Sequence, residues 1–155
     1  MKFITDTNLG KLAKWLRILG YDTVWYRGEA NRNFLRKAER EGRVVLTRKK
    51  DMAARQFSGK LVTIRSDGVQ EQLGEVMEKL SITADPDRLF NICVRCNKAL
   101  VAVDREDVSG MVPAFVYDTQ SAFRTCPGCK GIYWPGTHID NALNYLKTHI
   151  RRHHP

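Results

Sequence analysis

The sequence predicts an α/β protein with a mainly parallel sheet flanked by helices, followed by a small metal-bound module. Short apolar runs alternate with helical patterns as far as residue 80, and this alternation is typical of β-α-β units. The four cysteines all lie beyond residue 90, in two Cys-x-x-Cys pairs. A segment with Pro86 and three charged residues separates the two parts, at Ser81–Leu89. We therefore expect one domain at 1–85 and a second at 90–155.

The first expected elements are a strand and an amphipathic helix. Met1–Asp6 has the composition of a short buried strand that ends in a carboxylate. Asn8 is a suitable N-cap for the helix that follows, and Gly20 is a suitable residue to end it. Apolar residues recur between them at helical spacing, at Leu9, Leu12, Ala13, Leu16 and Leu19.

The remaining elements of the first domain continue the alternation. Further strands are expected at 23–26, 43–47 and 61–64. Helices are expected at 32–41, where Gly42 ends the pattern, and at 50–56 and 69–80. In the second domain we expect a pair of hairpin strands near 99–103 and 112–117, and a strand at 132–134. A final helix carries an apolar stripe, at Ile139, Ala142, Leu143, Leu146 and Ile150.

The cysteine pairs predict a zinc site. Cys93 and Cys96 precede Cys126 and Cys129 by 29 intervening residues, and each pair can form a tight turn that directs two sulfurs at one metal. Four thiolates complete a tetrahedral shell and leave no position for water, so the predicted Zn²⁺ is structural. Histidines are less favoured as ligands because all four thiols are present; the histidines are His138, His149, His153 and His154.

Three carboxylates follow the expected strands of the first domain. Asp6 ends the first strand, Glu29 follows the second, and Asp51 follows the third. Because function in open parallel sheets collects at the carboxyl ends of strands, these acids suggest a Mg²⁺ or Mn²⁺ site that faces phosphodiesters. Each acid taken singly also fits a turn or helix-cap role.

The balance of charge favours a polyanionic partner. The chain has 26 Lys and Arg against 17 Asp and Glu, a net charge of +9, and a positive surface attracts nucleic acid. Lys11, Lys14 and Arg17 recur at three-residue steps and share one face of the first helix. A basic protein without a nucleic-acid partner, with these residues as a plain solvated face, remains the alternative.

Four blocks of sequence resemble one known family along nearly the whole chain. They are Asp6–Asp22, Glu41–Arg48, Cys93–Asn97, and Cys126–Cys129 with Ile132–His138. In this order they resemble the Mut-seven C-terminal RNase family. The resemblance implies a PIN-like nuclease domain at 1–85, a zinc ribbon with a basic C-terminal helix at 90–155, and RNA cleavage as the activity.

The resemblance also assigns roles to the carboxylates. Asp6 matches the first metal-binding acid, and Asp51 matches the second acid of the family's L-T-R-D-x-D stretch. The first acid of that stretch is Lys49 here, a change of +2 in local charge that disfavours a second cation. An acid before the second helix is replaced by Asn31, with Glu29 as a nearby substitute.

Basic and aromatic side chains are the candidates for contacts with RNA. Arg48 and Lys49 are expected to bind phosphates beside the metal site, together with Lys11, Lys14 or Arg17. Tyr133 and Trp134 are able to stack on bases, although a role in the ribbon core is the favoured interpretation. His138 is expected to cap the last helix or to contact RNA, and the tail supplies further cations at Lys147, Arg151 and Arg152.

The sequence therefore predicts a cytoplasmic, Mg²⁺- or Mn²⁺-dependent endoribonuclease that acts on structured RNA. The alternative is an RNA-binding or adaptor protein with a degenerate nuclease site, for which Lys49 is the main evidence. A zinc-ribbon module for protein interaction is a third possibility. Apolar runs are too short to span a bilayer, the N-terminus lacks a signal-peptide pattern, and reduced cytosolic thiols favour zinc over disulfides.

Overall fold

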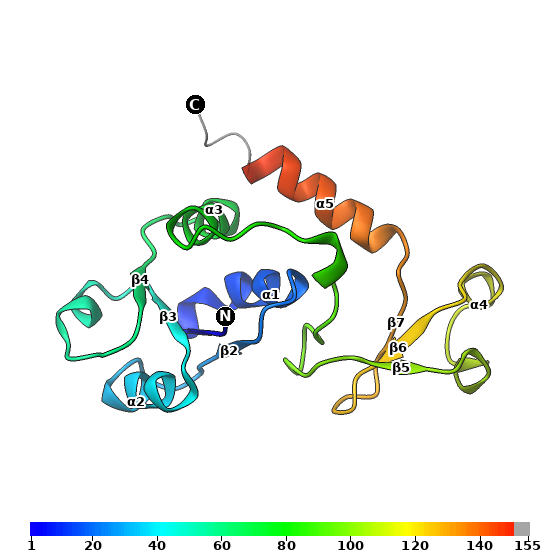
Figure 1. The fold of residues 1–155 in the computed structure, drawn as a ribbon, viewed down its shortest axis with the longest axis horizontal. Helices are drawn as coiled ribbons and strands as arrows, with labels where there is room; N and C mark the ends of the chain where they lie inside the picture. The colour runs from blue at the N-terminus through cyan, green and yellow to red at the C-terminus, as the bar shows by residue number, and fades with distance from the viewer. Residues whose placement is uncertain (151–155) are drawn as a thin grey trace.

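The computed structural model describes residues 1–150, except for the side chains of Thr137 and His138. Its first part is a parallel sheet with strand order β2-β1-β3-β4 (Figure 1). The strands are β1 (Phe3–Thr5), β2 (Thr23–Trp25), β3 (Val44–Thr47) and β4 (Leu61–Thr63). The predicted α/β class is confirmed. The expectations for the His138 side chain and for the tail at 151–155 lie outside the described residues.

Helices cover both faces of this sheet. On one face lie α1 (Gly10–Ile18) and α3 (Val69–Lys79), and on the other lies α2 (Arg32–Glu41) (Figure 1). Because successive strand residues point to opposite faces, Phe3 joins the apolar cluster beneath α1 and α3, whereas Ile4 joins the cluster beneath α2. We call residues 1–80 the sheet region.

Short 3₁₀ helices complete the connections. They are η1 (Thr7–Leu9), η2 (Lys50–Ala54), η3 (Pro86–Arg88) and η4 (Arg105–Val108). The expected helix at 50–56 is η2. The expectation that Asn8 caps the first helix was wrong, because the carboxylate of Asp6 accepts the backbone N–H of Asn8 and caps η1 instead. Gly20 does follow the end of α1, with a φ of 87° that suits glycine.

The second part is a three-stranded antiparallel sheet, which we call the ribbon region (residues 91–136). Its order is β5-β6-β7, with β5 at Val101–Val103, β6 at Phe123–Thr125 and β7 at Ile132–Tyr133. The strand expected at 112–117 was wrong, since α4 occupies Ala114–Thr119 and β5 pairs with β6. Pro113 has no N–H for a sheet ladder, and the helix begins directly after it.

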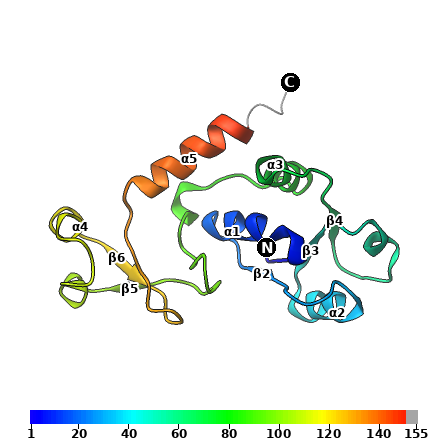
Figure 2. The ribbon, with the colours of Figure 1, turned by 180° about the vertical axis from the view of Figure 1, so that it is seen from behind.

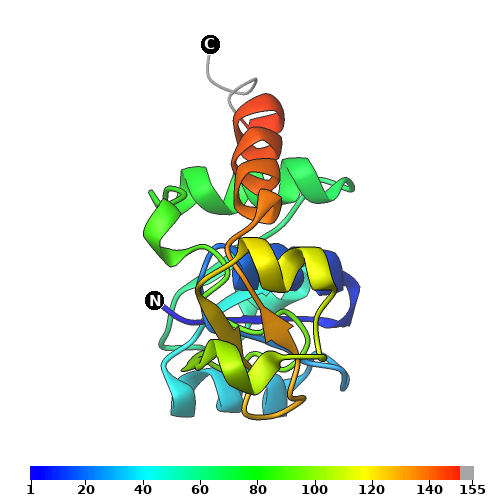
Figure 3. The same cartoon turned by 90° about the vertical axis from the view of Figure 1, so that its right-hand side faces the viewer.

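The last helix returns from the ribbon region to the sheet region. This helix, α5 (Thr137–Ile150), packs against α3, as Figures 2 and 3 show from two further sides. Leu146 is buried in the cluster beneath α1 and α3, and the ring of Tyr145 stacks on Trp15 at 4.5 Å. By chain order α5 follows the ribbon, but its apolar stripe belongs to the core of the first part.

Hydrogen bonds also join the two regions directly. The Asn97 side chain accepts from the backbone N–H of Thr23 at 2.8 Å and donates to the carboxylate of Asp22 at 2.6 Å. The backbone N–H of Phe90 donates to the carbonyl of Ile18 at 2.9 Å. In the described part of the chain, no helix combines the length and apolar character needed to cross a membrane.

Candidate functional site

The order of the strands indicates where on the sheet a ligand-binding site is expected. The chain passes from β1 to β2 on one side and returns to β3 on the other, so the winding reverses between β1 and β3. In open parallel sheets, ligands bind outside the carboxyl ends of the strands at such a reversal. Asp6 directly follows β1, and Arg48 directly follows β3.

The carboxylate of Asp6 lies at this reversal and connects the end of β1 to the end of β3. It is 2% exposed, and its Oδ2 accepts hydrogen bonds from the Thr47 hydroxyl at 2.8 Å and the Arg48 backbone N–H at 2.9 Å. Its Oδ1 accepts from the backbone N–H of Asn8 at 3.0 Å. These bonds use three of about four acceptor directions of a carboxylate, which fixes Asp6 firmly and leaves one direction for a further ligand.

The other two acids are exposed. Asp51 lies on η2 after β3, is 61% exposed, and pairs with Arg55 at 3.4 Å. Glu29 lies in the loop after β2. A hydrogen bond connects this loop to the residue that follows Asp6, since the Thr7 hydroxyl donates to the carbonyl of Gly28 at 3.3 Å. Across the described residues, the cysteines are the only group of three or more Cys, His, Asp or Glu side chains close enough to share an ion. Asp6, Glu29 and Asp51 thus do not form a three-carboxylate cluster.

The two residues expected to replace acids of the resembled family, Asn31 and Lys49, are both engaged locally. Asn31 caps α2, since its side-chain oxygen accepts the backbone N–H of Asn33 at 2.9 Å. The ammonium group of Lys49 donates to the carbonyl of Ala30 at 3.3 Å, in the loop after β2. The positive charge of Lys49 therefore lies beside the loop that follows β2.

The four cysteines do converge on one point. Their Sγ atoms all lie within 4.8 Å of one another, and those of Cys93 and Cys129 are 3.8 Å apart. A tetrahedral Zn²⁺ with Zn–S bonds of about 2.3 Å requires sulfurs about 3.8 Å apart. The four side chains therefore fit a closed tetrahedral metal site, as the spacing predicted.

Both Cys-x-x-Cys turns have the same backbone geometry. The residue after each pair, Asn97 or Lys130, has a left-handed φ of 58° or 62°. Each donates its N–H to the carbonyl of the first cysteine of its pair, in both cases at 2.9 Å. The repeated turn explains how the two distant pairs present their sulfurs in the same way.

The sulfur environment favours thiolate at one ligand. Burial raises the pKa of the Cys93 thiol, but hydrogen bonds from the Tyr133 hydroxyl and from backbone N–H groups outweigh burial and lower that pKa to about 6. The Tyr133 oxygen lies 3.2 Å from Cys93 Sγ. Hydrogen bonding with Cys129, followed by burial, raises the pKa of Cys96 to about 12. A bound cation would offset the charge of the Cys96 thiolate, whose pKa the protein alone raises.

Most of the expected RNA-binding cations are on the surface of the sheet region. Lys11 and Lys14 are exposed on α1. Arg48 is partly buried, and its guanidinium donates to the carbonyl of Ser66 at 2.8 Å and to the carboxylate of Asp67 at 2.6 Å. Asp67 is 95% exposed, so this ion pair is of the weak surface kind that a phosphate can displace.

Arg17 has a different environment from the exposed phosphate contact that the sequence suggested. It is 8% exposed; its Nε donates to the carbonyl of Thr23 at 2.9 Å, and its Nη1 donates to the carbonyl of Val94 at 2.7 Å. The guanidinium therefore joins α1 to β2 and to the first Cys-x-x-Cys turn. Helical spacing grouped Arg17 with Lys11 and Lys14. The sequence could not reveal its contact with the Val94 carbonyl, because Val94 lies 77 residues further along the chain.

Comparison with known proteins identifies the family. The family model described as Mut7-C RNAse domain matches residues 1–146. The chain belongs to this family. The match spans both the sheet region and the ribbon region, with Asp6 and all four cysteines inside it. No curated protein and no solved structure matches the chain. Membership in the Mut7-C RNase family indicates an RNase-type function with RNA as the substrate.

Two further cations suited to an RNase were missed in the sequence. Lys50 and Arg65 line a hollow of about 540 Å³ together with Arg48, between the ends of β3 and β4. Arg65 directly follows the expected strand at 61–64. Because ligands bind at the carboxyl ends of parallel strands, the sequence position of Arg65 would have been enough to identify it as a candidate.

Proposed function

We propose that this member of the Mut7-C RNase family is a metal-dependent endoribonuclease that hydrolyses phosphodiester bonds in structured RNA. The observation that carries the proposal is the carboxylate of Asp6, which is fixed across the reversal between β1 and β3 by hydrogen bonds from Thr47 and Arg48. A rigid carboxylate at the ligand-binding edge of a parallel sheet suits metal-assisted chemistry better than a structural role alone.

The donor set fits one Mg²⁺ or Mn²⁺ ion rather than two. Mg²⁺ is commonly held by one or two protein carboxylates, with waters and substrate phosphates as the other ligands. Asp6 offers one remaining acceptor direction, and Asp51 is exposed on η2 with only a long ion pair to Arg55. When bound, such an ion activates water and offsets charge on the phosphate. Glu29 follows Gly28, whose carbonyl accepts a hydrogen bond from the Thr7 hydroxyl, and Glu29 would hold a water ligand or an RNA hydroxyl.

The protein's cations would bind and orient the RNA. Arg48, Lys50 and Arg65 surround a hollow beside the carboxyl edge of the sheet, and Lys11 and Lys14 are exposed on α1. Lys49 adds a further charge next to the loop after β2. Phosphate contacts of this kind weaken steeply as salt concentration rises. Zn²⁺ at the cysteines has a structural role, and the reduced thiols that it requires are consistent with the cytoplasm.

The decisive experiment is a cleavage assay on a pool of structured RNAs with added Mn²⁺. We expect cleavage by the wild-type protein and its loss in Asp6→Asn. Asn is as good a helix N-cap as Asp, so this variant removes the charge while keeping the cap on η1. Asp118→Asn, an exposed acid on α4, is the matched control and should cleave normally. Undiminished cleavage by a folded Asp6→Asn variant would overturn the proposal.

A second function is favoured by Lys49, which stands where the family has an acid. In that case the protein binds RNA, or serves as an adaptor, without hydrolysing it. Retention of RNA without cleavage in Mg²⁺ or Mn²⁺ would select this function. Lys49→Asp then gives a sharp test, because it restores a carboxylate and removes the ammonium group at Ala30. Cleavage gained in Lys49→Asp and absent in wild type would identify a decayed nuclease site.

A further inference from the structure

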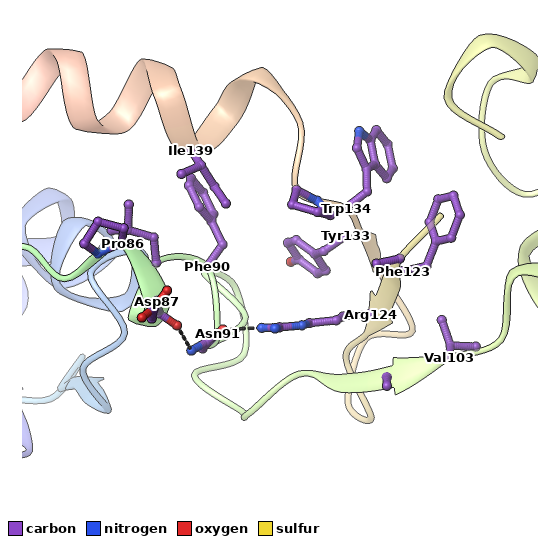
Figure 4. Close-up of a pocket in the computed structure, with 14 residues that line it drawn as sticks. Pro86, Asp87, Phe90, Asn91, Val103, Phe123, Arg124, Tyr133, Trp134 and Ile139 are labelled. Atoms are coloured by element: carbon purple, nitrogen blue, oxygen red, sulfur yellow. Dashed lines mark hydrogen bonds between the residues drawn. The ribbon is translucent and has the colours of Figure 1, made fainter. Parts of the chain in front are cut away.

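A cavity of about 500 Å³ lies where the ribbon region, the segment Pro86–Asn91 and the start of α5 meet (Figure 4). This volume is within the range of small-ligand sites, about 300–1,000 Å³. The cavity is distant in sequence from the acids at the edge of the sheet, and none of its lining residues belongs to that edge. It therefore requires an explanation of its own.

Aromatic rings form much of its wall. Phe90 contributes from the segment before the ribbon, Phe123 from β6, and Tyr133 and Trp134 from the β7 side. Phe123 is buried and meets Trp134 edge to face, with ring centroids 6.4 Å apart. Tyr133 and Trp134 are only half-buried, so their rings are not fully used in the ribbon core. Such a wall presents flat apolar faces to a planar ligand.

Polar groups stand at one side of the same cavity. Figure 4 shows Arg124 reaching from β6 toward Asn91, to which its guanidinium donates a hydrogen bond. Asn91 in turn donates to the backbone carbonyl of Asp87 at 2.9 Å. Within the described residues this is the only hydrogen bond of the Arg124 side chain, and the indole N–H of Trp134 has none. Donors therefore remain available beside the aromatic wall, and the carboxylate of Asp87 offers acceptors.

We propose that this cavity binds one unpaired base of the RNA, with Trp134 and Tyr133 as stacking surfaces and Arg124 as a contact to the base edge or the adjoining phosphate. The proposal rests on the proposed function to the extent that its ligand is RNA. Sequence-specific and structure-specific recognition of RNA commonly uses unpaired bases stacked on aromatic rings and arginine planes. A flat base matches the walls, and the positive charge of Arg124 matches the RNA backbone.

The arrangement also links the cavity to the zinc site. Tyr133 lines the cavity with its ring, while its hydroxyl lies 3.2 Å from Cys93 Sγ. The second cysteine pair precedes β7 by only a short turn. The metal-held turns therefore position one wall of the base site, so that the ribbon region contributes to the selection of substrate as well as to the fold.

The test compares two labelled RNA hairpins with the same stem, one fully paired up to a tight loop and one with several unpaired bases. Binding is measured by fluorescence anisotropy without added divalent cations, so that cleavage is not required. Loss of one stacking contact in Trp134→Leu should weaken binding of the second hairpin about 5- to 100-fold, and binding of the first much less. Phe115→Leu is the matched control, since Phe115 is 76% exposed on α4 and does not line the cavity.

Arg124→Gln is a second variant that disturbs the ribbon core less, because Arg124 is exposed. It should also weaken binding of the unpaired hairpin, and Arg95→Gln, an exposed arginine outside the cavity, controls for loss of general charge. Equal affinities of wild type and both cavity variants, with zinc retained, would overturn the base site. Cleavage that depends on Asp6 would in that case still support the nuclease. Binding that depends on Trp134 without any cleavage would support the base site and overturn the nuclease.

Discussion

The sheet region buries two apolar clusters between its strands and helices, whereas the ribbon region has a much thinner core. Its buried apolar residues, within the described chain, are Cys93, Val108, Phe123 and Cys126. Three of its apolar side chains, Val101, Met111 and Phe115, are largely exposed. Apolar burial therefore accounts for the folding of the first part. The ribbon region is too small to bury enough surface by itself, and its four clustered cysteines fit a metal site that would supply the missing stability.

The contact between the two regions, which we call the joint, is held by a different combination of interactions. It consists of buried or partly buried hydrogen bonds at Arg17, Asn97 and Asp22, and of the apolar stripe of α5. Hydrogen bonds of this kind contribute modestly when made and cost more when one partner is left unsatisfied. Each part of the molecule should therefore respond to a different perturbation.

Metal removal should have the largest effect and should separate the two regions. Structural zinc contributes on the order of 10 kcal/mol to the folding of small modules, so chelation or Cys93→Ser should unfold residues 91–136. The sheet region should keep its structure because both of its clusters are formed by other residues. Amide NMR spectra with and without chelator would measure this. Simultaneous loss of signals from β1 to β4 would contradict the division.

Arg17 should have an intermediate effect, and it separates a structural arginine from an RNA-binding one. Arg17→Met leaves the carbonyls of Thr23 and Val94 without this donor and should lower the free energy of unfolding by about 1–3 kcal/mol. Lys14→Met, on the exposed face of α1, should change it by less than about 0.5 kcal/mol while weakening RNA binding. Urea denaturation and RNA titrations of both variants would measure the two effects. Unchanged stability with weakened RNA binding in Arg17→Met would instead indicate that Arg17 contacts RNA.

Acidification should have the smallest effect, through the carboxyl of Asp22. Partial burial raises its pKa, but hydrogen bonds from Arg43 and Asn97 outweigh burial, and the net effect is a lowered pKa. The stability that this carboxylate contributes is therefore fully present above its unfolded pKa, about 3.9, and is lost as pH falls through the lower folded value. In urea denaturation between pH 5 and pH 3, wild type should lose more stability than Asp22→Asn. Release of a metal from the cysteines at low pH would affect both proteins alike. Equal losses of stability would therefore show that the Asp22 carboxylate does not stabilise the contact between the two regions.

Much of the sheet region could be predicted because its signals are local. Helical spacing at Leu9, Leu12 and Leu16 predicted α1, and the apolar run before Asp6 predicted β1, since side-chain periodicity follows directly from the backbone geometry of each element. The secondary structure of the ribbon region was harder to predict. The apolar residues at 112–117 suggested a strand, but Pro113 and the pairing of β5 with β6 made that segment a helix.

The sequence by itself determined the strands and helices of the first part, the position of Asp6 after a strand, and the cysteine spacing that fits a tetrahedral metal site. Only the tertiary structure decided that Arg17 supports the first Cys-x-x-Cys turn, that α5 returns to the first core, and that Arg124 meets Asn91 beside an aromatic cavity. The physical reason is the range of the interactions. Periodicity and turn geometry are set by residues a few positions apart, whereas these contacts join segments that approach one another only when the chain is folded.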